Sequence, residues 1–346
     1  MTSNAPNAHD KGVLVFHEQM SRRSALGLAG GVLGALAAAV LGRWGREAVR
    51  AEAPAAQSGT SATDEAIEHP EGSDEIVVRI EYVGGLMLPE ARLTQLPLAS
   101  LYGDGLLVTE GPQIMIFPPP ALPNLRQMRL AEEGIQAILA EADAAGLIGR
   151  SRRYDNRLIA DAPYTVLTIE AGGETTRTAV YALGSDNPEW SEEELAAVQA
   201  IQTFVGRFID PTSWLPAAAI AAGDELFPIE RLQVLGQPYD QAGLDPNDPS
   251  LDQPSVDWPI DTPISAFEAM GSLPGTPAGL SCGVLTGADA TAVAGAAADA
   301  NSLTPWVSEE QEWLLWLRPL LPDETGCPPR EPDPNIIPQP EATPEG

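Results

Sequence analysis

Lysine and histidine are nearly missing from this 346-residue chain, and both absences restrict what it can do. The sole lysine is Lys11, and 19 basic residues stand against 49 acidic ones, which gives a formal net charge of −30. A surface with this charge repels the phosphates of DNA and RNA, so a nucleic-acid partner is not expected. The same charge disfavours lying flat on anionic lipid.

The three histidines, His9, His17 and His69, all come before the expected globular part. Without an imidazole or an amine in that part, Ser-His-Asp catalysis, Cys-His catalysis and lysine Schiff-base chemistry are not expected. Zinc sites built on histidine or clustered cysteine are not expected for the same reason. The sequence also has no haem-attachment motif and no G-x-G-x-x-G nucleotide loop, so we predict no redox cofactor.

Cysteine occurs at two positions, Cys282 and Cys327. In an extracytoplasmic compartment, a single pair of this kind predicts one disulfide. The alternative is a pair of free thiols that are buried in the fold.

An apolar run follows a pair of arginines near the N-terminus. Arg22 and Arg23 precede the segment from Ser24 to Leu41, which is built mainly of Ala, Gly and Leu and is long enough to cross a bilayer. The arrangement resembles the twin-arginine export signal of bacteria, except that Ala25 stands where that signal usually has a bulky apolar residue. The resemblance implies an extracytoplasmic protein, secreted after cleavage or anchored in the membrane if the segment is not cut.

Composition divides the chain into six segments. Residues 1–20 form a polar n-region, with Met20 as an alternative start, and residues 21–53 are the export signal or membrane anchor. The remaining segments are a disordered linker, two folded domains and a disordered proline-rich tail, at 54–74, 75–215, 216–328 and 329–346.

The first domain has the patterns of strands paired in hairpins with helices between them. A β-branched run at Ile76–Val83 predicts a strand, and Asp104-Gly105 and Gly172-Gly173 predict hairpin turns. We expect one amphipathic helix at Ala131–Ala145 and another after the capping box Ser191–Glu194.

The second domain is expected to hold three strands and one helix. The strands are predicted at Arg231–Leu235, Cys282–Leu285 and Glu312–Arg318. The helix is predicted at Asp289–Ala300, with Thr286 as its cap and Asn301 as its end. Together the patterns predict the α+β class, as two small domains that each carry an antiparallel sheet and one or two packed helices.

Three short segments are similar to uncharacterised exported bacterial proteins with a twin-arginine-type signal. They are the hairpin Leu101–Gly105, the segment Asp161–Tyr164 and the segment Arg318–Glu324, within a resemblance that spans residues 95–328. That family has no assigned activity, so the resemblance implies export and no particular chemistry.

A cluster of oxygen-bearing side chains is a candidate calcium site. The possible ligands are Asp245, Asn247, Asp248 and Asp252. The segment departs from the EF-hand pattern because Pro249 and Ser250 stand where a ligand and the obligatory glycine belong. The alternative is that these residues make Asx turns in a loop.

Carboxylates offer the one route to hydrolysis that needs no histidine. A pair of them can cleave a glycosidic bond, one protonating the leaving oxygen while the other attacks or activates water. Asp155, Asp161 and Glu170 surround the best-defined strands and are the first candidates. The alternative is that they are solvated loop and edge residues.

Tryptophans gather in the C-terminal half and could stack on a sugar or grip a peptide, or instead pack in the core. They are Trp214, Trp258, Trp306, Trp313 and Trp316.

From these observations together we expect the protein to be a non-enzymatic binding module, attached to the envelope, with an extracytoplasmic protein or glycan as ligand. A carboxylate-dependent hydrolase is the alternative.

Overall fold

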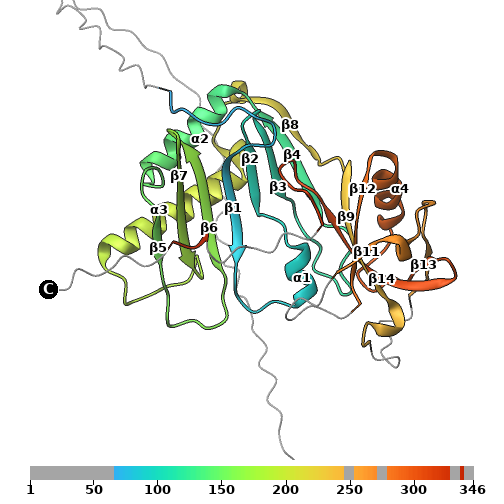
Figure 1. The fold of residues 1–346 in the computed structure, drawn as a ribbon. Coiled ribbons are helices and arrows are strands. Elements are labelled where there is room, and N and C mark those ends of the chain that lie inside the picture. The colour runs from blue at the N-terminus through green and yellow to red at the C-terminus, as the bar shows by residue number, and fades with distance from the viewer. Residues whose placement is uncertain (1–65, 245–252, 271–278, 328–335, 339–346) are drawn as a thin grey trace, which may run out of the picture. The chain divides into compact units, whose positions relative to one another are not determined.

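The computed structural model describes residues 66–244, 253–270, 279–327 and 336–338, which fall within one compact unit. These residues form two β-sheets and four α-helices, so the predicted α+β class is confirmed (Figure 1). The expected export signal, with Arg22 and Arg23, lies outside the described residues.

The first sheet has eight strands in the order β5-β7-β6-β1-β2-β3-β4-β8. Their bounds are β1 Ile76–Val83, β2 Ala99–Tyr102, β3 Leu106–Glu110, β4 Leu125–Leu130, β5 Arg152–Tyr154, β6 Tyr164–Ala171, β7 Glu174–Tyr181 and β8 Ile220–Leu226. Neighbouring strands are antiparallel except β5 and β7. Because β8 pairs with β4, this sheet extends past the expected domain boundary at residue 215.

Both predicted hairpin turns are present in the first sheet. The turn between β2 and β3 contains Gly105 at φ +83°, where an added Cβ would lie 2.3 Å from the carbonyl oxygen of Leu130. Only glycine allows β4 to approach the turn this closely. Gly172 and Gly173 join β6 to β7 with φ values of +61° and +75°, as a two-residue type I′ turn requires.

One face of the first sheet is covered by α2 (Glu132–Ala144) and α3 (Glu192–Ile209), which lie side by side in Figure 1. Each helix buries the apolar stripe that its sequence predicts, and together with the sheet they form the largest hydrophobic core. The predicted capping box at the start of α3 is confirmed. The N–H of Glu194 donates to Ser191 Oγ at 3.2 Å, and the N–H of Ser191 donates to Glu194 Oε2 at 2.8 Å.

The opposite face of the first sheet carries a small apolar cluster of Val83, Val166 and Ala179. Ile336 and Ile337 pack against this cluster and are half-buried. These two residues belong to the tail that composition predicts to be disordered, and they are ordered here because the sheet offers them apolar contacts. We call residues 336–338 the tail segment.

The second sheet has six strands in the order β10-β13-β14-β9-β12-β11. Their bounds are β9 Arg231–Pro238, β10 Val256–Asp257, β11 Glu268–Ala269, β12 Ser281–Thr286, β13 Trp306–Ser308 and β14 Gln311–Pro319. The pairs are antiparallel except β10 with β13. The three strands that the sequence predicts for this part are confirmed as β9, β12 and β14.

Helix α4 (Gly287–Ala297) packs against β9 and β12 of the second sheet and differs at both ends from its prediction. Thr286 is the residue before the helix, but its side chain makes no capping hydrogen bond. The helix ends at Ala297, and Asn301 instead donates through Nδ2 to Gln253 Oε1 at 2.8 Å. Short 3₁₀ turns complete the described structure at Pro211–Ser213, Ala217–Ala219, Tyr239–Gln241 and Ile264–Ala266.

The segment Ala66–Asp74, predicted to be linker, is folded against the first sheet and α2. Ile67 packs on the main core and exchanges two backbone hydrogen bonds with the side chain of Gln136. The side chain of His69 is 6% exposed, with Nδ1 2.6 Å from the Pro70 carbonyl oxygen and Nε2 3.1 Å from Glu132 Oε1. The expectation that the globular part lacks histidine is therefore wrong for this one residue.

The chain leaves β14 through a segment that is held at several points. Arg318 donates two hydrogen bonds to Glu324, each 2.6 Å long, and both side chains are buried. Cys327 forms the predicted disulfide with Cys282 on β12.

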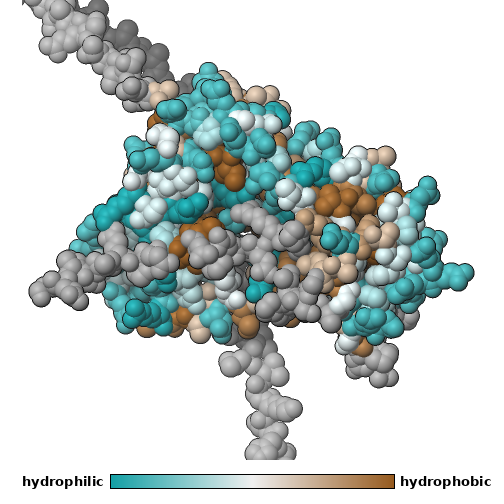
Figure 2. All heavy atoms as spheres, viewed as in Figure 1, coloured by the Kyte–Doolittle hydropathy of each residue, from teal (hydrophilic) through white to brown (hydrophobic). Residues whose placement is uncertain are grey.

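Hydrophilic residues predominate on the face drawn in Figure 2, with hydrophobic residues gathered in smaller areas between them. No helix among the described residues is both long and apolar enough to cross a membrane.

Candidate binding cavity at the end of strand β1

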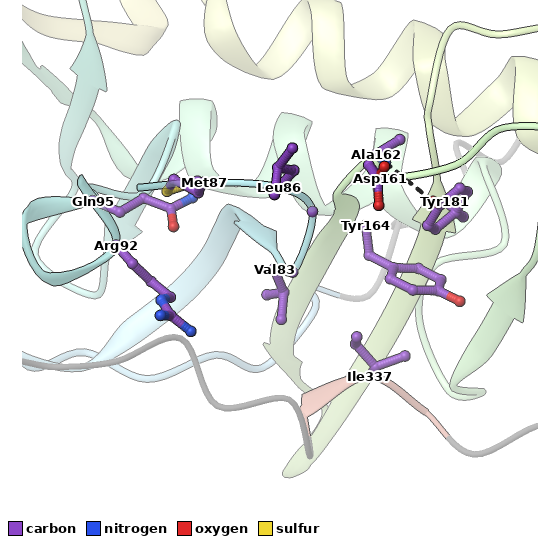
Figure 3. A pocket seen from close by; sticks show the side chains of 12 residues that line it. Val83, Leu86, Met87, Arg92, Gln95, Asp161, Ala162, Tyr164, Tyr181 and Ile337 are labelled. Atoms are coloured by element: carbon purple, nitrogen blue, oxygen red, sulfur yellow. Dashed lines mark hydrogen bonds between the residues drawn. The ribbon is translucent and has the colours of Figure 1, made fainter. Parts of the chain in front are cut away.

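A cavity of about 580 Å³ lies where the end of β1, the helix α1 (Pro89–Thr94) and the start of β6 meet. Figure 3 shows Arg92 and Gln95 on one side, Tyr164 and Tyr181 on the other, and Ile337 of the tail segment beneath. The lining residues are Val83, Gly84, Gly85, Leu86, Met87, Arg92, Gln95, Asp161, Ala162, Tyr164, Tyr181 and Ile337.

Two segments in the left-handed backbone region build one wall of the cavity. Gly84 and Gly85 turn the chain after β1 with φ values of +77° and +81°, and Asp161 has a φ of +61°. The N–H of Leu86 donates to the carbonyl oxygen of Asp161 at 3.0 Å, which joins the two segments. A Cβ on Gly85 would lie 2.9 Å from Pro163 N, so the wall requires glycine there.

Helix α1 positions the opposite wall. Its Leu93 is buried in a cluster with Leu235 and Leu280 of the second sheet region. Beyond the helix, the side chain of Gln95 donates to the carbonyl oxygen of Tyr82 at 3.0 Å, and the backbone carbonyl oxygen of Gln95 accepts from Arg318 Nε at 3.2 Å. These contacts fix the helix, so Arg92 projects from a rigid element.

The lining is largely apolar and aromatic. Leu86 is 84% exposed, whereas Val83 is buried at the base. The rings of Tyr164 and Tyr181 meet edge to face with centroids 5.0 Å apart, and the hydroxyl of Tyr181 accepts from Ala162 N at 3.0 Å. A mostly apolar pocket with a few fixed polar groups is the usual form of a binding site.

Arg92 brings positive charge to this strongly acidic chain. Its side chain is exposed, and it forms no ion pair with any carboxylate of the described residues. Other arginines of that part pair with acids, as Arg126 does with Asp224 and Arg207 with Glu141. Arg92 is therefore available to an anionic group of a ligand.

Tyr164 is held by two charged neighbours beside the cavity. Its hydroxyl donates to Asp155 Oδ1 in a short hydrogen bond, while Arg153 donates to the same oxygen at 2.8 Å and to the tyrosine hydroxyl at 2.6 Å. Burial, together with the carboxylate, raises the pKa of Tyr164 to about 12. Burial alone would raise the pKa of Asp155, but the hydrogen bonds from Tyr164 and Arg153 outweigh it and lower that pKa. The phenol is thus protonated and the carboxylate ionised at neutral pH.

The three candidate catalytic carboxylates do not form one site. Asp155 is bound to Arg153 and Tyr164, and only Asp161 lines the cavity. Glu170 lies six residues after Tyr164 on the same strand, which places it about 20 Å away. A glycosidase pair needs carboxylates about 5–10 Å apart, so Glu170 cannot pair with either of the others.

The candidate calcium ligands Asp245, Asn247, Asp248 and Asp252 lie outside the described residues. Within the described ranges, no group of three or more His, Cys, Asp or Glu side chains is arranged to hold a metal ion.

The tryptophans named from the sequence serve packing. Trp306 and Trp313 are buried in the core of the second sheet, and Trp258 meets Trp306 edge to face at 6.0 Å. Trp316 faces a different cluster from Trp313, as alternation along β14 predicts. Trp214 donates through Nε1 to the carbonyl oxygen of Arg207 at 2.9 Å. None of these five rings is offered as an exposed platform for a sugar.

Sequence reasoning missed most of the cavity. The segment Asp161–Tyr164 was singled out for its resemblance, but Arg92, Leu86 and Ile337 were not named. The pair Gly84-Gly85 after a strand was the available signal, because consecutive glycines mark a sharp change of direction. Comparison with protein-family models, with curated proteins and with solved structures finds no match for the chain.

Proposed function

We propose that this chain is an extracytoplasmic, non-enzymatic binding module whose cavity takes a short apolar segment of a protein partner. The observation that carries the proposal is the position of Ile337, which contributes to the cavity wall although it lies far along the chain from the other lining residues. A short peptide segment with an apolar side chain is therefore already an occupant of this surface.

The chemistry of the lining supports a peptide of mixed character. Leu86, Met87 and the two tyrosine rings provide apolar contact, and the exposed Arg92 favours a carboxylate in the partner. The wall is fixed before any ligand arrives, because the glycine turn and Asp161 are joined by a backbone hydrogen bond. A preformed site loses less conformational freedom on binding.

Location outside the cytoplasm is supported by two independent features. The disulfide between Cys282 and Cys327 is typical of an oxidising compartment. Residues 21–53 resemble an export signal, which leaves the protein secreted or membrane-anchored according to whether the signal is cut.

The test uses a fluorescent peptide with the sequence of residues 331–341, measured by fluorescence polarisation against the full chain. In the native protein the tail segment competes at the high effective concentration of a tethered group. We therefore expect the variant I336S/I337S to bind the peptide about tenfold or more tightly than the native chain does. Equal affinity for the two proteins would contradict the proposal.

Substitutions at exposed lining positions locate the binding. In the I336S/I337S background, Leu86→Glu and Arg92→Gln are expected to weaken binding several-fold, and Arg92→Gln also to reduce its dependence on salt. Leu158→Glu is the matched control, because Leu158 is 54% exposed and does not line the cavity. If Leu158→Glu weakens binding as much as Leu86→Glu, the peptide binds elsewhere.

A further inference from the structure

Four consecutive apolar side chains are exposed on the loop between β3 and β4. Ile114, Met115, Ile116 and Phe117 are 65%, 96%, 57% and 75% exposed. Single apolar residues on a surface are ordinary, but a contiguous group of large ones marks a site of interaction. We call Ile114–Phe117 the apolar tip.

The loop that carries the apolar tip is held at its base. Gln113 donates through Nε2 to the carbonyl oxygens of Gly111 at 2.9 Å and Asn124 at 3.1 Å, which closes the loop. After the tip, the carbonyl oxygen of Pro119 accepts from Ser302 N at 2.9 Å, and Ala121 N donates to the carbonyl oxygen of Ala300 at 3.1 Å. The fold therefore fixes this loop at both ends while its tip points to solvent.

The loop is also free of charge. No Asp, Glu, Lys or Arg occurs from Gly111 to Pro123, although charged residues make up 20% of the chain. The tip thus carries none of the negative charge that gives the protein its net −30. An uncharged apolar tip on an acidic protein is suited to a medium in which charge is costly, which is the bilayer interface.

The size of the tip favours lipid over protein as its occupant. Four side chains of these exposures present on the order of 500 Å², less than the roughly 800 Å² that each partner contributes to a standard protein interface. We propose that the apolar tip inserts into the interfacial region of a lipid bilayer and lays the folded domain on the membrane.

The N-terminal sequence would hold the folded part near a bilayer if its apolar run stays in the membrane. From Leu41, the last residue of the apolar run, to Ala66 there are 24 intervening residues, and a flexible chain of that length spans roughly 27 Å on average. Such a tether raises the effective concentration of the domain at the membrane to the millimolar range. This step rests on the proposed membrane attachment, whereas the properties of the apolar tip do not.

The insertion is tested with a reporter at the most exposed position of the tip. In the full-length chain, Met115→Cys is labelled with an environment-sensitive NBD dye, since Cys282 and Cys327 are joined in a disulfide. The protein is mixed with phosphatidylcholine vesicles that do or do not contain a shallow spin-labelled lipid. We expect the emission to shift to the blue and the spin label to quench it.

The control is the same dye at Glu193→Cys, an exposed position on α3, where no shift and no quenching are expected. An unchanged emission at position 115, or equal quenching at both positions, overturns the proposal. A second variant adds I114E/F117E to the labelled chain. It is expected to leave the dye in water even when the N-terminal segment keeps the protein on the vesicle.

Lipid charge and self-association provide further decisive outcomes. Because of the net charge, adding phosphatidylglycerol at low salt is expected to reduce the emission shift, and added salt to restore it. If light scattering shows a dimer that I114E/F117E abolishes, the tip is a protein interface and the proposal fails. The peptide affinity of the cavity is measured separately, so failure of either proposal is recognised without the other.

Discussion

Arg79 on β1 and Asp323 after β14 form a two-pronged ion pair between residues 244 positions apart. The guanidinium donates to the two carboxylate oxygens at 2.8 and 2.7 Å, and the side chains are only 2% and 19% exposed. Ser100 accepts from Arg79 Nε, and the hydroxyl of Tyr102 donates to Asp323 at 2.7 Å. Each nitrogen of this buried guanidinium thus donates a hydrogen bond to a side chain of the protein.

Removing the carboxylate from this pair is expected to destabilise the protein. Asp323→Asn leaves the Arg79 charge buried without compensation, and we expect the free energy of unfolding to fall by about 3–5 kcal/mol in a urea titration. Asp224→Asn is the matched control, because its pair with Arg126 is partly exposed to solvent and contributes far less to stability. Equal losses in the two variants would show that the buried pair contributes no more than a surface one.

Acid should weaken the same contact. Burial alone would raise the pKa of Asp323, but the hydrogen bonds and charge of Arg79 outweigh it and hold that pKa below its usual range. The folded-state pKa is therefore lower than the unfolded value of about 3.9. The stabilisation is complete above that unfolded value and is lost as the pH falls through the folded pKa.

We expect urea midpoints measured from neutral pH downward to drop below about pH 4. The drop should be smaller in Asp323→Asn, which has no proton to bind at this site. A native chain and a variant with parallel pH curves would refute the linkage.

The disulfide is expected to be a large source of stability. It joins two cysteines that are 45 positions apart in the sequence, for which the chain-entropy model gives about 4 kcal/mol as an upper estimate. The variant C282S/C327S should therefore unfold at lower urea than the native chain. Thiol counting by mass spectrometry provides the check on the native chain, and two free thiols in protein made by export would contradict it.

Tyr164 is predicted to ionise late in an alkaline titration. Its pKa of about 12 exceeds the unfolded value of about 10, so its contribution to stability is full below pH 10 and is lost as the pH rises through 12. Ultraviolet absorbance of tyrosinate in the native chain and in Tyr164→Phe isolates this residue.

Asp155→Asn removes the charged acceptor of the Tyr164 hydroxyl and should lower the pKa of Tyr164. Burial remains in that variant, so the pKa should stay above the unfolded value. A titration unchanged by Asp155→Asn would show that the carboxylate does not govern this phenol.

The sequence predicted those elements whose signals are local. The turn at Gly172-Gly173 and the capping box at Ser191–Glu194 each depend on a few adjacent residues, and both are present. Strand β8 was not predicted, because Ile220–Leu226 is mostly exposed and has no apolar alternation. It is a strand through its pairing with β4, which only the folded chain supplies.

The candidate site was harder to predict for the same reason. Arg92, Leu86 and Ile337 come from three separate parts of the chain, and none of them stands in a pattern that implies the other two. The carboxylates were recognisable as reactive groups, but residue type alone does not show that Asp155 is already bound by Arg153 and Tyr164. The sequence thus identified which side chains are reactive, but not which of them lie close together in the fold.

The tail segment changes how the proline-rich C-terminus should be regarded. Its composition suggests a part that can be trimmed without harm, yet Ile336 and Ile337 cover Val83, Val166 and Ala179. A protease that cut before residue 336 would bare an aliphatic patch next to the tyrosine pair. Cleavage at this end would then expose one face of the first sheet. The exposed apolar side chains would favour association with other protein chains or aggregation.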